Sequence, residues 1–166
     1  NEAIKKLGMT DVELVINLQG DEPLMNVEDI QKLHAQMVKT KFELGTLASN
    51  ITDRESYDNL NVVKVVTKES LDNSQFPEAI NFIRKLNDKP KNIYKHLGIY
   101  CYKLKTLEKF VSFNQSVNEI KYKLEQLRAL DNDIKINVAF AKSSPIGVDT
   151  KEDFVAIKKI MEYKSK

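Results

Sequence analysis

Short apolar runs alternate along the chain with segments whose apolar residues recur at helical spacing. The run Leu14–Leu18 is mostly apolar and stops at the Gly- and Pro-containing segment 19–23, a pattern typical of a buried strand that ends in a loop. Four further stretches are rich in β-branched residues or alternate between apolar and polar positions, and they are predicted as strands: residues 46–51, 62–66, 99–102 and 134–141.

Four segments are predicted as helices. Asn26 is placed to cap a helix that continues to about Lys39 and has Ile30, Leu33, Met37 and Val38 on one face. Residues 104–113 and 119–130 follow, the second with an apolar stripe of Ile120, Leu124, Leu127 and Leu130. Thr150 and Asp153 resemble a capping box at the start of the last helix, whose apolar positions are Phe154, Ile157, Ile160 and Met161.

Residues 68–92 are polar and weakly patterned, so we expect a loop there with one ordered patch around residues 79–84. Strands interleaved with helices predict a single α/β domain over residues 1–166 with a mainly parallel sheet.

Composition narrows the class of protein. The 166 residues include 42% hydrophobic and 30% charged residues, as in an ordinary soluble globular domain. The formal net charge of +2 gives no broad cationic field, so no nucleic-acid partner is expected. No apolar run approaches the ~20 residues that span a membrane, and the single cysteine, Cys101, fits a reducing compartment and a core position. We therefore expect a soluble, cytoplasmic protein.

Two carboxylates stand in loops where an α/β sheet binds its ligands, outside the carboxyl ends of strands. Asp21 follows the first predicted strand and Asp149 lies between the 134–141 strand and the last helix, each close to a glycine. Oxygen donors from separate loops suit Mg²⁺. However, each aspartate could equally satisfy backbone N–H groups or support a helix cap. His96 and Arg84 leave the same choice open, between a ligand contact and an ordinary surface or hydrogen-bonded polar group.

Five motifs resemble those of the 3-deoxy-manno-octulosonate (Kdo) cytidylyltransferases, also called CMP-Kdo synthetases. They occur in the family's order and span nearly the whole chain. Val15–Leu24 resembles V-N-x-Q-G-D-E-P, Asn61–Val66 resembles N-x-V-K-V-V, and His96–Tyr102 resembles H-x-G-I-Y-x-Y. Leu124–Leu130 resembles L-E-Q-L-R-x-L, and Gly147–Asp153 resembles G-V-D-T-x-E-D.

The resemblance implies a Rossmann-like nucleotide-diphospho-sugar transferase fold that works as a homodimer. It implies a Mg²⁺-dependent reaction in which Kdo attacks the α-phosphorus of CTP and yields CMP-Kdo and pyrophosphate for lipopolysaccharide synthesis. By the same resemblance, Asp21 and Asp149 are the catalytic, metal-binding residues. The residues that line the sugar pocket would then be Gln19, Arg84, His96, Tyr100, Glu125 and Gln126.

The family's first strand and its phosphate-binding loop, P-A-R-x-x-S-x-R-x-P-G-K, have no counterpart in this sequence. Three alternatives to a Kdo-activating enzyme therefore stay open. The chain could be a non-catalytic remnant that dimerises, a cytidylyltransferase for another sugar acid such as sialic acid, or a generic α/β domain that binds no metal.

Overall fold

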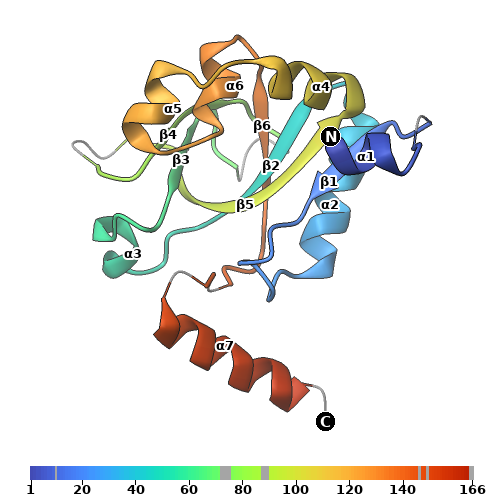
Figure 1. Cartoon of the computed structure of the whole chain (residues 1–166). Helices are drawn as coiled ribbons and strands as arrows, with labels where there is room; N and C mark the ends of the chain where they lie inside the picture. Colours follow the sequence, from blue (N-terminus) through green and yellow to red (C-terminus); the bar gives the residue numbers. More distant parts are fainter. Residues whose placement is uncertain (10, 72–75, 87–89, 146, 149, 165–166) are drawn as a thin grey trace.

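A twisted six-stranded sheet with helices on both faces forms the body of the protein (Figure 1). The computed structural model describes residues 1–166 except 10, 72–75, 87–89, 146, 149 and 165–166. The strands are β1 (Leu14–Asn17), β2 (Leu44–Ser49), β3 (Lys64–Thr67), β4 (Ala79–Ile83), β5 (Ile93–Lys103) and β6 (Ile136–Phe140). The helices are α1 (Glu2–Lys6), α2 (Val27–Lys39), α3 (Arg54–Asp58), α4 (Leu104–Ser112), α5 (Val117–Tyr122), α6 (Leu127–Asp131) and α7 (Lys151–Lys164).

The sheet is mixed, so the expectation of a mainly parallel sheet was wrong. Its order is β4-β3-β5-β2-β6, with β1 also paired to β5. Within the described residues, β2 and β6 run parallel, whereas β5 is antiparallel to all three of its neighbours. The period-2 pattern of a strand carries no information on the direction of its partners, which explains the error.

Each face of the sheet has its own apolar core. On one face, Tyr100 and Tyr102 of β5 pack with Phe110 of α4 and Leu127 of α6. On the other face, Leu97, Ile99 and Cys101 of β5 pack with Leu33 and Met37 of α2. Successive strand residues point to opposite faces, which is how one strand serves both cores. The helix predicted after Asn26 is confirmed, with the Asn26 side chain accepting a hydrogen bond from the Glu28 N–H at 2.8 Å.

The predicted single helix over residues 119–130 is instead two short helices, α5 and α6. Lys123 ends α5 in the left-handed region, at φ 53° and ψ 48°, a conformation that closes a helix. Leu124 and Leu127 are buried as expected, but Ile120 is 62% exposed. In the turn between the two helices, Leu124 packs into the core beneath α4 and α6 and Gln126 is buried, whereas Glu125 is exposed.

The last helix begins as expected but buries little of its apolar surface. The Asp153 N–H donates to the Thr150 hydroxyl at 3.1 Å, and the Thr150 N–H donates to the Asp153 carboxylate at 2.9 Å, so the capping box is confirmed. Of the four predicted apolar positions, Ile157 is buried, whereas Phe154 is 57% exposed. Figure 1 shows α7 standing apart from the sheet. No described helix is long and apolar enough to cross a membrane.

Gly45 of β2 lets α2 lie close against the sheet. A Cβ atom at this position would stand 2.8–2.9 Å from side-chain atoms of Leu33, Met37 and Phe76. We predict that Gly45→Ala lowers the free energy of unfolding by about 1–3 kcal/mol, because three packed side chains must shift together. Denaturant unfolding measures the change. Gly20→Ala is the control, since a Cβ there meets no atom within 4 Å; an equal loss in both variants would contradict the packing argument.

Candidate active site

A cleft of about 810 Å³ opens beside the middle of β5. Residues Ile93–Lys95 of β5 pair with β3, and residues Tyr100–Lys103 pair with β1 on the same edge. Neither partner strand covers the intervening segment 96–99. The cleft lies where the two partner strands leave this gap. It is lined by the segments that follow β1, β4, α5 and β6 and by the segment between β2 and β3.

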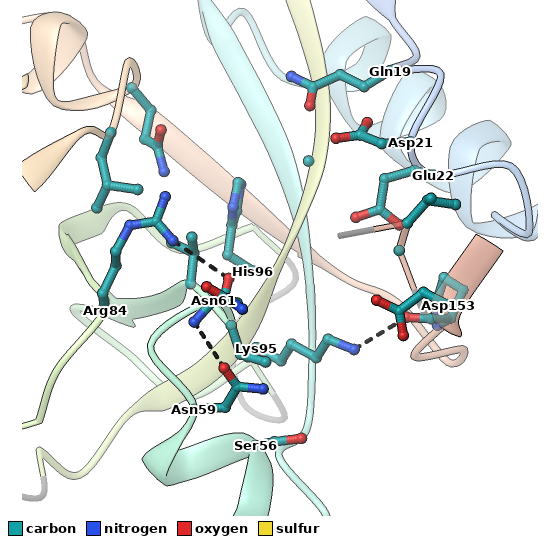
Figure 2. Close-up of a pocket in the computed structure, with 18 of the residues that line it drawn as sticks. Gln19, Asp21, Glu22, Ser56, Asn59, Asn61, Arg84, Lys95, His96 and Asp153 are labelled. Carbon is teal, nitrogen blue, oxygen red and sulfur yellow. Dashed lines mark hydrogen bonds between the residues drawn. The ribbon is translucent and has the colours of Figure 1, made fainter. Parts of the chain in front are cut away.

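The cleft gathers every sequence-predicted site residue that the structure describes. These residues come from four separate parts of the chain and are Gln19, Asp21, Arg84, His96, Tyr100, Glu125 and Gln126. Asp149, the eighth predicted residue, lies outside the described residues. Figure 2 shows Arg84 and Asp21 on opposite sides of the cleft with His96 between them. The roles assigned to these residues stay predictions, but their convergence is a property of the fold.

The floor of the cleft is neutral around His96 and Tyr100. Burial lowers the pKa of the His96 imidazole to about 3, so this ring carries no charge at neutral pH. Burial, with the nearby Tyr102 and Glu125, raises the pKa of Tyr100 well above its usual value. Gln19 extends from the loop after β1 across Gly98, where a Cβ would stand only 3.1 Å from its side-chain oxygen. Such neutral donors and acceptors suit sugar hydroxyls.

Arg84 supplies positive charge on one side of the cleft. Its Nη1 donates to the carbonyls of Leu60 at 3.1 Å and Asn61 at 3.4 Å, and its Nη2 donates to the Lys123 carbonyl at 3.3 Å. These bonds leave Nε–H and one Nη2–H without a partner among the described residues, and no described carboxylate forms an ion pair with the guanidinium. A planar fork of two N–H donors matches an incoming carboxylate or phosphate.

A buried lysine strengthens this cationic side. Lys64 of β3 is 0% exposed, and its ammonium donates to the Asn59 carbonyl at 2.7 Å and the Arg84 carbonyl at 2.9 Å. Burial lowers the pKa of Lys64, which Asp58 partly opposes. The two hydrogen bonds join the end of β4 to the segment before β3, which is the segment that also holds the Arg84 guanidinium. Lys64 therefore fixes the backbone from which Arg84 reaches the cleft.

An ion pair supports the wall that carries Glu125 and Gln126. Arg128 of α6 donates to both carboxylate oxygens of Glu119, from Nε at 2.7 Å and from Nη2 at 2.5 Å. The same Nη2 reaches Glu125 at 3.2 Å, and the guanidinium lies 4.8 Å from the centre of the Phe110 ring. The bonds from Arg128, joined by the Ser116 N–H, lower the pKa of Glu119 to about 2. This pair thus connects α5 to α6 across the left-handed Lys123 and orients Glu125.

The opposite side of the cleft is acidic. Asp21 is exposed at the cleft, and its backbone carbonyl accepts a hydrogen bond from the Val148 N–H at 2.8 Å. Buried Asp29 of α2 holds the start of the loop that leads there, accepting from the N–H groups of Lys142 and Ser143 at 3.0 and 3.2 Å. The loop after β6 therefore lies against the loop after β1, as the two-carboxylate hypothesis requires.

The donor set fits Mg²⁺ only in part. The described residues contain no group of three or more His, Cys, Asp or Glu side chains placed to hold a metal ion. Mg²⁺ usually takes one or two protein carboxylates and completes its shell with water and substrate phosphates, so such a group is not required. Asp21 meets the requirement for one carboxylate, and Asp149 remains a predicted ligand.

Sequence reasoning missed several polar residues of the cleft, among them Asn59, Asn61, Lys95 and Lys123. Lys95 precedes His96 on β5 and donates to the Pro145 carbonyl at 3.1 Å, which joins the floor to the acidic side. One signal was available for Lys64, because a lysine in the middle of a β-branched run indicates a buried, hydrogen-bonded cation. No local signal marks the asparagines, whose place depends on how the chain turns before β3.

Comparison with known proteins identifies the family. The sequence profile of the family described as Cytidylyltransferase matches residues 1–136. A 3-deoxy-manno-octulosonate cytidylyltransferase of Thermodesulfovibrio yellowstonii is 38% identical over 96% of this chain and 67% of the relative. The chain belongs to the 3-deoxy-manno-octulosonate cytidylyltransferase family. The enzyme of that name from Francisella tularensis subsp. holarctica is 39% identical over 96% of this chain. The chain spans 66% of the length of that relative.

Solved structures agree with the fold of this chain. A CMP:2-keto-3-deoxy-manno-octonic acid synthetase complexed with CTP superposes with a TM-score of 0.82 at 27% identity, over 98% of this chain and 67% of that one. An apo UDP-glucose pyrophosphorylase superposes with a TM-score of 0.67 at 12% identity, over 99% of this chain and 59% of that one, and it shows the fold alone. The α/β nucleotidyltransferase fold expected from the motifs is confirmed, and the generic α/β alternative is set aside.

The Glu119–Arg128 pair makes a prediction for the pH dependence of stability. The pKa of Glu119 is depressed in the folded state, so its contribution is complete above the unfolded value and is lost as pH falls toward 2. We predict that Glu119→Gln removes about 1–3 kcal/mol of unfolding free energy at pH 7 and flattens the loss of stability below pH ~4.5.

Denaturant unfolding between neutral and acidic pH measures both effects. Glu108→Gln serves as the control because Glu108 is exposed on α4. A pH profile of Glu119→Gln parallel to that of the parent chain would contradict the pair's assigned role.

Proposed function

We propose that this chain provides the Kdo site and a metal-binding carboxylate of an enzyme that makes CMP-Kdo from CTP and Kdo. In the proposed reaction, the anomeric hydroxyl of Kdo forms a new P–O bond to the α-phosphorus of CTP. The bond from that phosphorus to the bridging oxygen of pyrophosphate breaks, pyrophosphate leaves, and the hydroxyl proton passes to solvent. Positioning and charge neutralisation carry most of the catalysis in this kind of transfer.

The charge pattern of the cleft is the observation that carries this proposal. Kdo is both an acid and a sugar, so its site needs a cation for the carboxylate and neutral groups for the hydroxyls. Arg84 provides two N–H donors on one side that have no partner among the described residues, and neutral His96, Tyr100 and Gln126 lie on the floor and wall. Asp21 lies on the far side, away from the cation. A carboxylate bound at Arg84 would direct the rest of the sugar toward Asp21.

We propose Mg²⁺ as the cofactor, held by Asp21 and Asp149. Bound Mg²⁺ would neutralise charge on the triphosphate and on the leaving pyrophosphate. The position of Arg84 and Asp21 on opposite sides of the cleft supports this assignment. The repulsion between the guanidinium and a divalent cation at Asp21 falls as the distance between them increases. Asp21 itself would orient the nucleotide through the metal while leaving the Kdo hydroxyls to the neutral floor.

We also propose that the protein is a homodimer located in the cytoplasm, as the resemblance to the family implies. Light scattering coupled to size-exclusion chromatography tests the first of these proposals directly. A monomeric mass at micromolar concentration would overturn it.

Two alternative functions predict different measurements. A non-catalytic remnant would bind a partner copy without releasing pyrophosphate. A cytidylyltransferase for sialic acid would prefer that sugar in a binding comparison, whereas the relatives described above carry the Kdo name, which favours Kdo.

We predict that pyrophosphate release requires CTP, Kdo and Mg²⁺ together and falls about 100-fold or more in Asp21→Ala, because a metal ligand is lost. A coupled pyrophosphate assay on the full chain measures this rate. Asp21→Asn is the matched variant that keeps the shape but not the charge, and we expect a comparable loss. Release that is unchanged in both variants would exclude Asp21 as a metal ligand, and no release from the parent chain would favour the remnant.

We predict that Arg84→Ala raises the dissociation constant for Kdo by about 10- to 100-fold, because a charge-assisted two-point contact is removed. The dissociation constant for Mg²⁺–CTP should change by less than about 3-fold. Isothermal titration calorimetry measures both ligands. Arg54→Ala is the control. The Arg54 side chain is 96% exposed, pairs with Asp58 and is not among the residues that line the cleft. Equal losses for both ligands would argue against a carboxylate at Arg84.

A further inference from the structure

The pairing of β2 with β5 slips beside His96. Thr46 is opposite Tyr100, but the next residue, Leu47, is opposite Leu97, so β5 carries two extra residues at this point. Bulges of this kind bend a strand and re-aim its side chains. Thr46 is 0% exposed and lies on the same sheet face as His96 and Tyr100, and its hydroxyl fills the bulge.

The hydrogen bonds of Thr46 determine where the proton of His96 resides. Thr46 Oγ1 lies 2.7 Å from the Ile99 carbonyl oxygen and 3.0 Å from His96 Nε2. A hydroxyl has one proton, and a carbonyl can only accept. Two oxygen atoms 2.7 Å apart are within hydrogen-bond distance and would repel each other without a proton between them. The Thr46 proton therefore points to Ile99, and Nε2–H of His96 must be the donor to Thr46.

Neighbouring aromatic rings restrict rotation of the His96 imidazole. Phe82 and His96 pack edge to face with ring centres 5.0 Å apart, and the Tyr100 ring lies tilted against His96 at 5.5 Å. A ring flip would place a carbon next to the Thr46 hydroxyl and leave a buried polar group without its partner, which costs about 1–3 kcal/mol. With Nε2–H occupied, the ring has one remaining polar atom, Nδ1, and that atom can only accept.

We propose that Thr46 is a positioning residue that holds His96 as the Nε2–H tautomer, so that His96 offers the cleft a hydrogen-bond acceptor that selects a ligand hydroxyl and rejects an ionised carboxylate or phosphate. This proposal rests on the proposed function for the identity of the ligand. It divides recognition of the sugar acid between two residues. Arg84 takes the anionic group, and His96 takes a group that carries a proton to donate.

Nitrogen NMR tests the tautomer without any ligand. Long-range ¹H–¹⁵N correlation spectra distinguish a protonated from a bare ring nitrogen, and the chain has two histidines, His34 and His96. Exposed His34 is an internal reference, and His34→Gln assigns the signals. We expect neutral His96 with Nε2 protonated at pH 7. A protonated Nδ1 in the parent chain would overturn the proposal whatever the enzyme's substrate is.

Thr46→Val and Thr46→Ser test the positioning role. Val has the same shape but lacks the hydroxyl, so the Nε2–H loses its acceptor and the Nδ1–H tautomer should become populated. Ser restores the hydroxyl and should restore the Nε2–H tautomer. With Kdo in calorimetry, we expect about a 10-fold weaker dissociation constant for Thr46→Val and near-parent binding for Thr46→Ser.

The outcomes separate this proposal from the proposed function. A Val variant with the parent tautomer and the parent Kdo affinity would overturn the role of Thr46. A parent chain that shows the expected tautomer but binds no Kdo would overturn the choice of substrate and support the assignment of the His96 proton.

Discussion

The organisation of the site depends on one constraint, which is that β1 and β3 both pair with the same edge of β5. Because two strands cannot pair with the same residues along one edge, β1 and β3 pair with opposite ends of the 11-residue β5. The middle of β5 is left to face the cleft. The loop that follows β1 and the segment that precedes β3 then meet over that part of β5, because β1 ends and β3 begins beside it. The cleft is thus a direct result of strand length and pairing.

Two arginines near the cleft illustrate how the fold separates stability from recognition. Arg128 is neutralised by two hydrogen bonds to the buried Glu119 carboxylate, so its charge stabilises the turn between α5 and α6. Arg84 is held by neutral carbonyls, and Lys64 holds its backbone in the same way. Carbonyl dipoles orient a cation without cancelling its charge. The positive charge of Arg84 is therefore available to attract an anionic ligand, whereas the charge of Arg128 is balanced by the Glu119 carboxylate.

Much of the local structure could be predicted because it depends on neighbours in sequence. The helix that begins after Asn26 and the capping box of Thr150 and Asp153 are local hydrogen-bonding patterns, and both are present. The break at Lys123 was missed since the apolar spacing of residues 119–130 continues through it, and a lysine rarely marks a left-handed turn. Most of β5 was missed because Lys95, His96 and Gly98 interrupt its apolar pattern, and these are residues that face the cleft.

The sequence alone determined the family, the positions of most strands and helices, and the set of residues that converge, since all of these are encoded in motifs and local spacing. Only the tertiary structure decided the direction of the strands, the gap along β5, and the groups that keep or lose their charge. Those properties depend on contacts between residues far apart in the chain, such as Thr46 with His96 and Lys64 with Arg84. The chemistry of a side chain in this cleft is set by the backbone groups that fold against it, which no local pattern records.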